Sequence, residues 1–277
     1  MIWRVIPFNR LSASENMAMD EAIFRENQRN DSPPTLRLYG WCPPSISLGY
    51  FQETRDELNV SVCNRYQIDI VRRPTGGKAV LHENDLTYAV IAKEHNPLFT
   101  QNILGTYRII SGCIADALSE LGIHAEMSAD GRTTGNDPLK AVCFSSPSHY
   151  ELLVNRRKIC GSAQVRSRGV FLQHGSILLD FDPVKTCALF VSRDANRERQ
   201  VEKLRESVTS VYEYTGVDIS VTKMCHVLQK SFEKKLCIEL VEGGLTAKEA
   251  ALMARLIKDK YTNDQWNMEG KRTLHGY

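Results

Sequence analysis

Residues 150–180 read YELLVNRRKICGSAQVRSRGVFLQHGSILLD, and their pattern predicts three consecutive β-strands. Two turns, at residues 155–157 and 167–169, separate runs that are rich in Leu, Val, Ile and Phe. Alternation along a strand would place Lys158 and Cys160 on one face and Ile159 on the other. The small residues that follow, Gly161-Ser162-Ala163, would leave room for a ligand against this strand.

The rest of the chain mixes strands and helices without a regular βαβ alternation. Hydrophobic periodicity and turn residues predict strands at the N-terminus and at 35–41, 45–51, 68–73, 86–93 and 237–241, and helices from Ser14 onward and at 57–66, 106–121, 222–236 and 246–261. Residues 129–139 are polar and aperiodic, which favours a loop. We therefore expect an α+β fold with a large mixed sheet flanked by helices. The expected organisation is a single domain over residues 1–277, with a core at about 31–242 and a helical C-terminal extension at about 243–277.

The composition excludes several classes of protein. Hydrophobic residues make up 42% and charged residues 25% of the chain, as in ordinary globular proteins. The formal net charge of +2 argues against a dedicated nucleic-acid binder. No apolar run approaches the roughly 18 residues that span a bilayer, and no signal-peptide pattern is present, so we expect a cytoplasmic protein without a membrane partner. The eight cysteines lack CxxC pairs and zinc-finger spacing, which predicts free thiols and no metal site.

A glycine pair marks the first stretch that could carry chemistry, RRPTGGKAVLH at residues 72–82. Gly76 and Gly77 follow a predicted strand and would let the backbone approach a ligand closely. The spacing matches neither the P-loop nor the dinucleotide-binding fingerprint. A hairpin turn with a basic flank explains the stretch equally well.

Three further stretches contain reactive side chains. AVCFSSPS at 141–148 places Cys143 at the end of the polar loop, where the thiol is either exposed or packed beside its apolar neighbours. RRKICGSAQ at 156–164 places Lys158 next to the small residues, although an isolated lysine is usually solvated. LQHGSILLD at 172–180 interrupts an apolar strand with His174 and Gly175, and this histidine could equally belong to the core.

Taken in order and spacing, RRPTGGKAVLH, AVCFSSPSHYEL, RKICGSAQ and LQHGSILLD resemble the lipoate/biotin protein ligase superfamily. Within it, they are most similar to the cysteine-dependent octanoyl-acyl carrier protein:protein N-octanoyltransferases of lipoate biosynthesis. The resemblance extends from Asn16 to Asn267, and four motifs in register are far more specific than one. It implies the mixed-sheet fold shared by class II aminoacyl-tRNA synthetases and biotin–lipoate ligases.

The resemblance also implies roles for individual residues. Cys143 matches the nucleophile that carries the acyl group as a thioester, and Lys158 matches the lysine that lowers the pKa of this thiol. A lysine beside a thiol favours the thiolate, which is the reactive form. The implied substrate-binding residues are Arg73, Gly76, Gly77, His82, Gly161, Ser162, Ala163, His174 and Gly175. No metal or redox cofactor is implied.

The implied partners are two proteins, an acyl carrier protein as donor and the glycine cleavage H protein or another lipoyl-domain protein as acceptor. Because such proteins are typically acidic, we expect a basic docking rim, although a solvated charged face is the alternative. The candidates for this rim are Arg72, Arg73, Arg156, Arg157, Arg166 and Arg168.

Two departures from the family's sequence pattern keep other interpretations open. Cys160 stands where the family tends to have a smaller apolar residue and is a rival nucleophile, and Lys78 stands where lipoate ligases tend to have a third glycine. An ATP-dependent lipoate–protein ligase is the main alternative, with Lys158 contacting an acyl-adenylate and Cys143 uninvolved. A non-catalytic binder of carrier proteins is a third, against which the Cys143–Lys158 pair argues.

Overall fold

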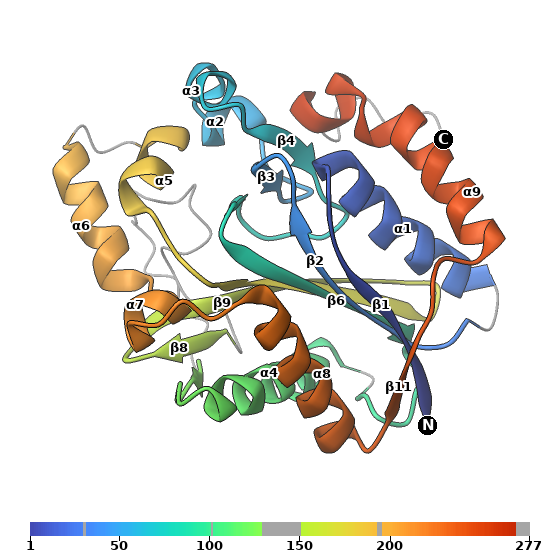
Figure 1. Ribbon diagram of the computed structural model, residues 1–277. Coiled ribbons are helices and arrows are strands. Elements are labelled where there is room, and N and C mark those ends of the chain that lie inside the picture. Colours follow the sequence, from blue (N-terminus) through green and yellow to red (C-terminus); the bar gives the residue numbers. More distant parts are fainter. Residues whose placement is uncertain (30–31, 101, 129–150, 193–195, 270–277) are drawn as a thin grey trace.

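The computed structural model describes residues 1–277 except 30–31, 101, 129–150, 193–195 and 270–277 (Figure 1). Among these residues, an eight-stranded sheet has the order β11-β1-β2-β6-β10-β9-β8-β7 and a three-stranded sheet the order β4-β3-β5. The strands of the large sheet are β1 (Ile2–Leu11), β2 (Thr35–Trp41), β6 (Asp85–Lys93), β7 (Glu126–Met127), β8 (Leu152–Val154), β9 (Arg157–Ser167), β10 (Val170–Leu178) and β11 (Glu239–Glu242). Those of the small sheet are β3 (Ser45–Leu48), β4 (Asp69–Arg72) and β5 (Val80–His82).

Helices cover both faces of the large sheet. They are α1 (Ala13–Arg29), α2 (Thr54–Glu57), α3 (Val60–Arg65), α4 (Ile103–Glu120), α5 (Pro183–Leu189), α6 (Arg197–Ser207), α7 (Val211–Thr215), α8 (Val221–Leu236) and α9 (Ala247–Leu256), followed by the π-helical turns η1 (Ile257–Tyr261) and η2 (Gln265–Glu269). In Figure 1, α1 and α9 lie on one face and α4 and α8 on the other. None of the helices in these described ranges is long and apolar enough to cross a membrane.

The central strand β6 shows why the sheet is covered twice. Tyr88 and Val90 point into the hydrophobic cluster formed with α4 and α8, whereas Ala89 and Ile91 point into the cluster formed with α1 and α9. The sheet is mixed, because β1 pairs in parallel with β2 and β11 while β2, β6, β10, β9 and β8 pair antiparallel. The predicted α+β class with a large mixed sheet is confirmed.

The stretch 150–180 forms β8, β9 and β10, as predicted, but one expected detail is wrong. Leu153 pairs with Lys158 and Leu152 pairs with Cys160, so Ile159 is an extra residue in a β-bulge. The bulge interrupts the alternation, and Ile159 and Cys160 both enter the hydrophobic cluster beneath α4. Lys158 and Cys160 therefore do not share a face.

The Gly76-Gly77 turn is not a hairpin turn. It joins β4 to β5, and these two strands lie on opposite sides of β3, which pairs in parallel with β4 and antiparallel with β5. Gly77 has φ +92°, a conformation that favours glycine. A side chain on Gly49 would collide with the carbonyl group of Gly77, so the turn packs directly against the end of β3.

Other elements differ from the predictions in extent. The expected helix at 57–66 is two short helices, α2 and α3, and the helices α5, α6 and α7 were not predicted. The first strand lies inside the large sheet, between β11 and β2. At the other end, η2 reaches back to β4, where Trp266 Nε1 donates to Arg72 O at 3.0 Å.

Candidate active site

A cavity of about 150 Å3 is lined by residues of both sheets, of α1 and of the turn after β4. Its walls are formed by Met17, Tyr39, Trp41, Ser47, Arg73, Gly77, Lys78, Val80, His82, Thr87, Glu151, Gly161, Ser162, Ala163, His174, Gly175 and Ser176. All of the expected substrate-binding residues line this cavity except Gly76, which adjoins it in the same turn. The structure thus brings together expected residues that are up to 102 positions apart in sequence, as Arg73 and Gly175 are.

The floor of the cavity consists of small residues, and two of its glycines have no room for a side chain. A Cβ atom on Gly175 would lie 2.5 Å from Gly161 O and 2.7 Å from Tyr88 Cε1. A Cβ atom on Gly161 would lie 2.8 Å from Lys158 Cε. Ser162 Oγ is 2.6 Å from the hydroxyl oxygen of Tyr88, which fixes this part of the floor.

Lys158 forms a buried ion pair beside this floor. Its Nζ donates to Glu151 Oε1 at 2.5 Å, and the two side chains are 2% and 5% exposed. Glu151 itself lines the cavity. The sequence interpretation gave Glu151 no role, although a carboxylate at the start of an otherwise apolar strand is a usable signal, because a buried charge requires a partner.

Cys143 lies outside the described residues. The last described residue before the segment is Ser128, and the first described residue after it is Glu151. Ser128 N donates a hydrogen bond to Glu151 O at 2.9 Å. Glu151, the first described residue after the segment, lines the cavity and forms the ion pair with Lys158.

The rival nucleophile Cys160 is poorly placed for reaction. It is 1% exposed and packs in the hydrophobic cluster. Burial raises the pKa of its thiol to about 12, although nearby Lys158 partly opposes this. A thiol of this kind is inert at neutral pH, because the thiolate is the nucleophile.

The two histidines on the cavity wall each bridge a carboxylate and a hydroxyl. His174 Nδ1 is 3.1 Å from Asp20 Oδ2, and its Nε2 is 2.7 Å from Thr75 Oγ1. Burial lowers the pKa of His174, with Arg73 and His82 acting in the same direction and Asp20 opposing, so its imidazole is neutral at pH 7.

His82 repeats this arrangement on the other side of Arg73. Its Nδ1 is 2.8 Å from Asp85 Oδ2, and its Nε2 is 2.8 Å from Ser47 Oγ. The ring stacks on Trp41 with 4.1 Å between the ring centroids. The indole Nε1 of Trp41 is in turn fixed by donating to Thr87 Oγ1 at 2.8 Å.

The six arginines expected in a docking rim do not form one. Arg72 and Arg73 are 0% and 4% exposed, and their guanidinium groups donate to carbonyl oxygens inside the protein. Arg157 pairs with Glu213 and Arg166 with Glu94. The two that are exposed, Arg156 and Arg168, lie in the turns at opposite ends of β9.

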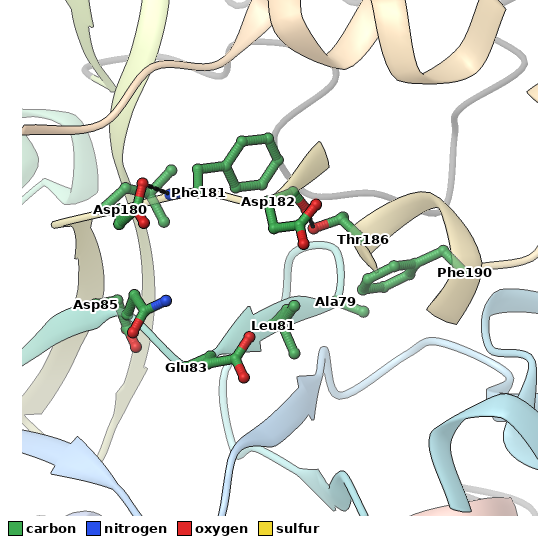
Figure 2. A pocket seen from close by; sticks show the side chains of 11 residues that line it. Ala79, Leu81, Glu83, Asp85, Asp180, Phe181, Asp182, Thr186 and Phe190 are labelled. Carbon is green, nitrogen blue, oxygen red and sulfur yellow. Dashed lines mark hydrogen bonds between the residues drawn. The ribbon is translucent and has the colours of Figure 1, made fainter. Parts of the chain in front are cut away.

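A second, much smaller pocket of about 20 Å3 lies around Asp85 and is rich in carboxylates (Figure 2). These groups have structural partners. Glu83 accepts from Lys185 Nζ at 2.5 Å, and Asp182 accepts from the backbone N–H groups of Val184 and Lys185 at the start of α5. The cavity beside Lys158 is therefore the better candidate for the active site.

Comparison with known proteins identifies the family of the chain. Residues 12–233 match the model of the lipoyl protein ligase A/B catalytic domain. The octanoyltransferase LipM of Halalkalibacterium halodurans is 39% identical over 270 residues, which cover 96% of this chain and 98% of the relative. The corresponding values for the octanoyltransferase LipM of Bacillus subtilis are 37% over 270 residues, 96% and 97%.

Solved structures of lipoate–protein ligases share the fold. A bipartite lipoate protein ligase of Thermoplasma acidophilum superimposes with a TM-score of 0.84 at 26% identity and 100% coverage of both chains. A lipoate-protein ligase A bound with ATP gives a TM-score of 0.80 at 26% identity, with 97% and 99% coverage. The chain therefore belongs to the lipoyl protein ligase A/B family of catalytic domains. Within this family it is an acyltransferase of the octanoyltransferase type.

Proposed function

We propose that the enzyme moves an octanoyl group from octanoyl-acyl carrier protein to a lysine of a lipoyl-domain protein, such as the glycine cleavage H protein, through a thioester on Cys143. The observation that carries the proposal is the buried ion pair between Lys158 and Glu151, because Glu151 lines the cavity and is the first described residue after the segment that contains Cys143. It places a cation within one small site together with space for an acyl chain.

In the first step, the thiolate of Cys143 attacks the thioester carbonyl carbon of the donor. The new carbon–sulfur bond forms as the bond to the carrier's sulfur breaks, and the carrier leaves as a thiolate that takes a proton. Lys158 favours the thiolate form of Cys143 by its positive charge. One thioester replaces another, so no nucleotide is needed to drive the step.

In the second step, the neutral amine of the acceptor lysine attacks the acyl carbon on Cys143. An amide bond forms, the thioester bond breaks, and the Cys143 thiolate is restored while the nitrogen loses its proton. The covalent intermediate divides the transfer between two proteins into two separate docking events. A single small site can therefore serve both partners in turn.

The small floor residues support binding of a saturated chain. Gly161, Ala163 and Gly175 leave the space above β9 and β10 open, and Met17 and Val80 add apolar surface. Burial of each methylene contributes about 0.8 kcal/mol. Shortening the acyl chain by two carbons should therefore weaken binding by roughly tenfold.

An ATP-dependent ligase is the second candidate, because a structural relative was solved with ATP. The names of the sequence relatives favour the transferase, and Lys78 replaces a glycine that ligases tend to have in the turn. The test is incubation with octanoyl carrier protein and a lipoyl domain, with and without ATP. We expect octanoyl-lysine to form without ATP. Product that requires both ATP and free octanoate would instead support the ligase.

A further inference from the structure

We propose that His82 and His174 are positioning residues that act through Arg73 on the wall of the acyl cavity. Each histidine links a buried carboxylate to a hydroxyl group, and both hydroxyl groups hold the same guanidinium. Arg73 in turn fixes the Gly76–Lys78 turn. The inference rests on the proposed use of this cavity for the acyl chain.

The hydrogen bonds determine the tautomers of both rings. In each ring Nδ1 faces a carboxylate oxygen, of Asp20 or Asp85, and therefore carries the proton. In the neutral form of each ring Nε2 accepts, and in that form Thr75 Oγ1 donates to His174 and Ser47 Oγ donates to His82. Each hydroxyl oxygen is left with its lone pairs for another donor.

Arg73 supplies that donor to both hydroxyl groups. Its Nε donates to Thr75 Oγ1 at 3.1 Å, and its Nη1 donates to Ser47 Oγ at 3.2 Å and to Ser47 O at 2.8 Å. Its Nη2 donates to the carbonyl oxygens of Gly76 and Lys78, both at 2.8 Å. These five bonds equal the five N–H groups of a guanidinium, so its orientation is fully determined.

The turn depends on this guanidinium. Gly77 and Lys78 line the cavity, and a Cβ atom on Gly77 would lie 2.8 Å from Arg73 Nη2. The turn therefore wraps closely around the guanidinium, and any rotation of Arg73 would move the cavity wall. Asp20 and Asp85 are anchored as well, the first by Arg37 and Tyr39 and the second by Thr87 and Ser176.

The same geometry argues against a role for either histidine as the base that deprotonates the acceptor lysine. All four imidazole nitrogens are engaged within the protein. Ser47, His82 and Asp85 do follow the order of a nucleophilic triad. However, Ser47 is 2% exposed and its hydroxyl also accepts from Arg73, and Thr75, His174 and Asp20 repeat the arrangement on the other side of the guanidinium.

The test compares Thr75→Val with Thr75→Ser in the full chain, using an octanoyl pantetheine thioester as donor and a lipoyl domain as acceptor. Valine keeps the shape of threonine but removes the hydroxyl, whereas serine retains it. We expect Thr75→Val to raise KM for the thioester about tenfold, as for loss of one hydrogen bond to a charged group, with kcat within about threefold of wild type. Thr75→Ser should stay within about twofold of wild type.

A double-mutant cycle that combines Thr75→Val with Ser47→Ala tests whether the two hydroxyl groups act on the same guanidinium, that of Arg73. Because both hydroxyl groups hold Arg73, the double variant should raise KM by less than the product of the two single effects. Independent, multiplicative effects would overturn the proposal. So would a fall in kcat at unchanged KM, which would assign acid–base or nucleophilic chemistry to these residues.

Thermal unfolding of each variant establishes that it is folded, and His174→Gln provides a second route if Thr75→Val is not. Glutamine can place an acceptor near the position of Nε2 but has no donor at the position of Nδ1, so the link to Asp20 is lost and this variant should also change KM more than kcat. The adduct on Cys143 is measured separately in wild type by mass spectrometry. Its absence would reject the proposed thioester, whereas unchanged KM values in all variants would reject only the positioning role.

Discussion

The two sides of the cavity hold their cations in different ways. On the side of the turn, carbonyl and hydroxyl oxygens of described residues accept from the guanidinium of Arg73, and the two hydroxyl groups are linked through His174 and His82 to the carboxylates of Asp20 and Asp85. On the side of β9, the ammonium group of Lys158 is bound directly by the carboxylate of Glu151. Both cations are buried.

This difference indicates different roles. A planar guanidinium with five directed bonds is fixed in orientation and can move only if several bonds break together. An ammonium group is a compact charge on a flexible chain, and it can follow a negative charge that develops nearby. We infer that the side of the turn shapes the cavity, while Lys158 takes part in the chemistry.

The strongest test of these different roles for Arg73 and Lys158 is the variant Lys158→Ala. Removing the cation should slow acylation of Cys143 by about a hundredfold or more, the usual size for loss of a preorganised charge contact. The pKa of the Cys143 thiol should rise, because the thiolate loses its counter-charge. The measurement is the rate of alkylation at Cys143 as a function of pH, which should shift to higher pH in the variant.

The control for Lys158→Ala also removes the negative charge of Glu151. Lys158→Ala alone buries the carboxylate of Glu151 without its lysine, which is destabilising in itself. Lys158→Ala combined with Glu151→Gln should recover stability but not activity. An alkylation profile identical to wild type in both variants would exclude Lys158 from the mechanism.

A smaller effect is expected from Gly161→Ala. The added Cβ would lie 2.8 Å from Lys158 Cε and 3.0 Å from its Nζ, so the side chain must shift. Because misplacement of a catalytic group is costly even over short distances, kcat should fall by about tenfold with little change in stability. Gly244→Ala is the matched control, since nothing lies within 4 Å of its Cβ position. Equal activity of the two variants would contradict the importance of the position of Lys158.

The pH dependence of stability tests the side of the turn. Burial lowers the pKa of His174 below its unfolded value of about 6.5, so the folded state binds fewer protons than the unfolded state at mildly acidic pH. The resulting stability is fully present above about pH 6.5 and is lost as the pH falls through the lower folded pKa.

The comparison variant is His174→Gln, which does not titrate in this range. Urea unfolding between about pH 7.5 and pH 5 should show a smaller loss of stability in this variant than in wild type. A steeper loss in the variant would mean that His174 is not held neutral by its surroundings.

The smallest effect concerns docking. Arg156 is exposed in the turn that precedes Lys158, whereas Arg168 is exposed at the far end of β9. Arg156→Glu should raise KM for the carrier-protein donor about threefold and leave a small octanoyl thioester unaffected, because a single exposed charge near the site acts mainly on association. Arg168→Glu should change neither. Equal loss with both donors would mean that Arg156 supports the site instead of docking a partner.

Much of the fold could be predicted from local patterns. The strands within 150–180 and the helices near residues 106–121 and 222–236 follow from strong periodicity and clear turn residues, and they are present as expected. The short helices α5 to α7 could not be found in this way, because each buries only a few residues.

Part of the cavity lining was predictable from the sequence, but its arrangement was not. Motif resemblance selected residues that surround one cavity, yet the bulge at Ile159, which puts Lys158 and Cys160 on different faces, cannot be revealed by a two-residue period. Similarly, Arg72 and Arg73 looked like surface charges, because the oxygens that bind them come from distant segments. Among them are the carbonyl groups of Gln52 and Trp266, which accept from Arg72 at 2.6 and 2.9 Å.

The central claim is that Cys143 carries the acyl group, and intact-mass measurement tests it most directly. The enzyme is incubated with octanoyl carrier protein in the absence of ATP, digested and mapped. We predict one octanoyl adduct per chain, located on the peptide that contains Cys143 and lost in Cys143→Ala. An adduct on Cys160, or no adduct together with activity that requires ATP and free octanoate, would contradict this mechanism.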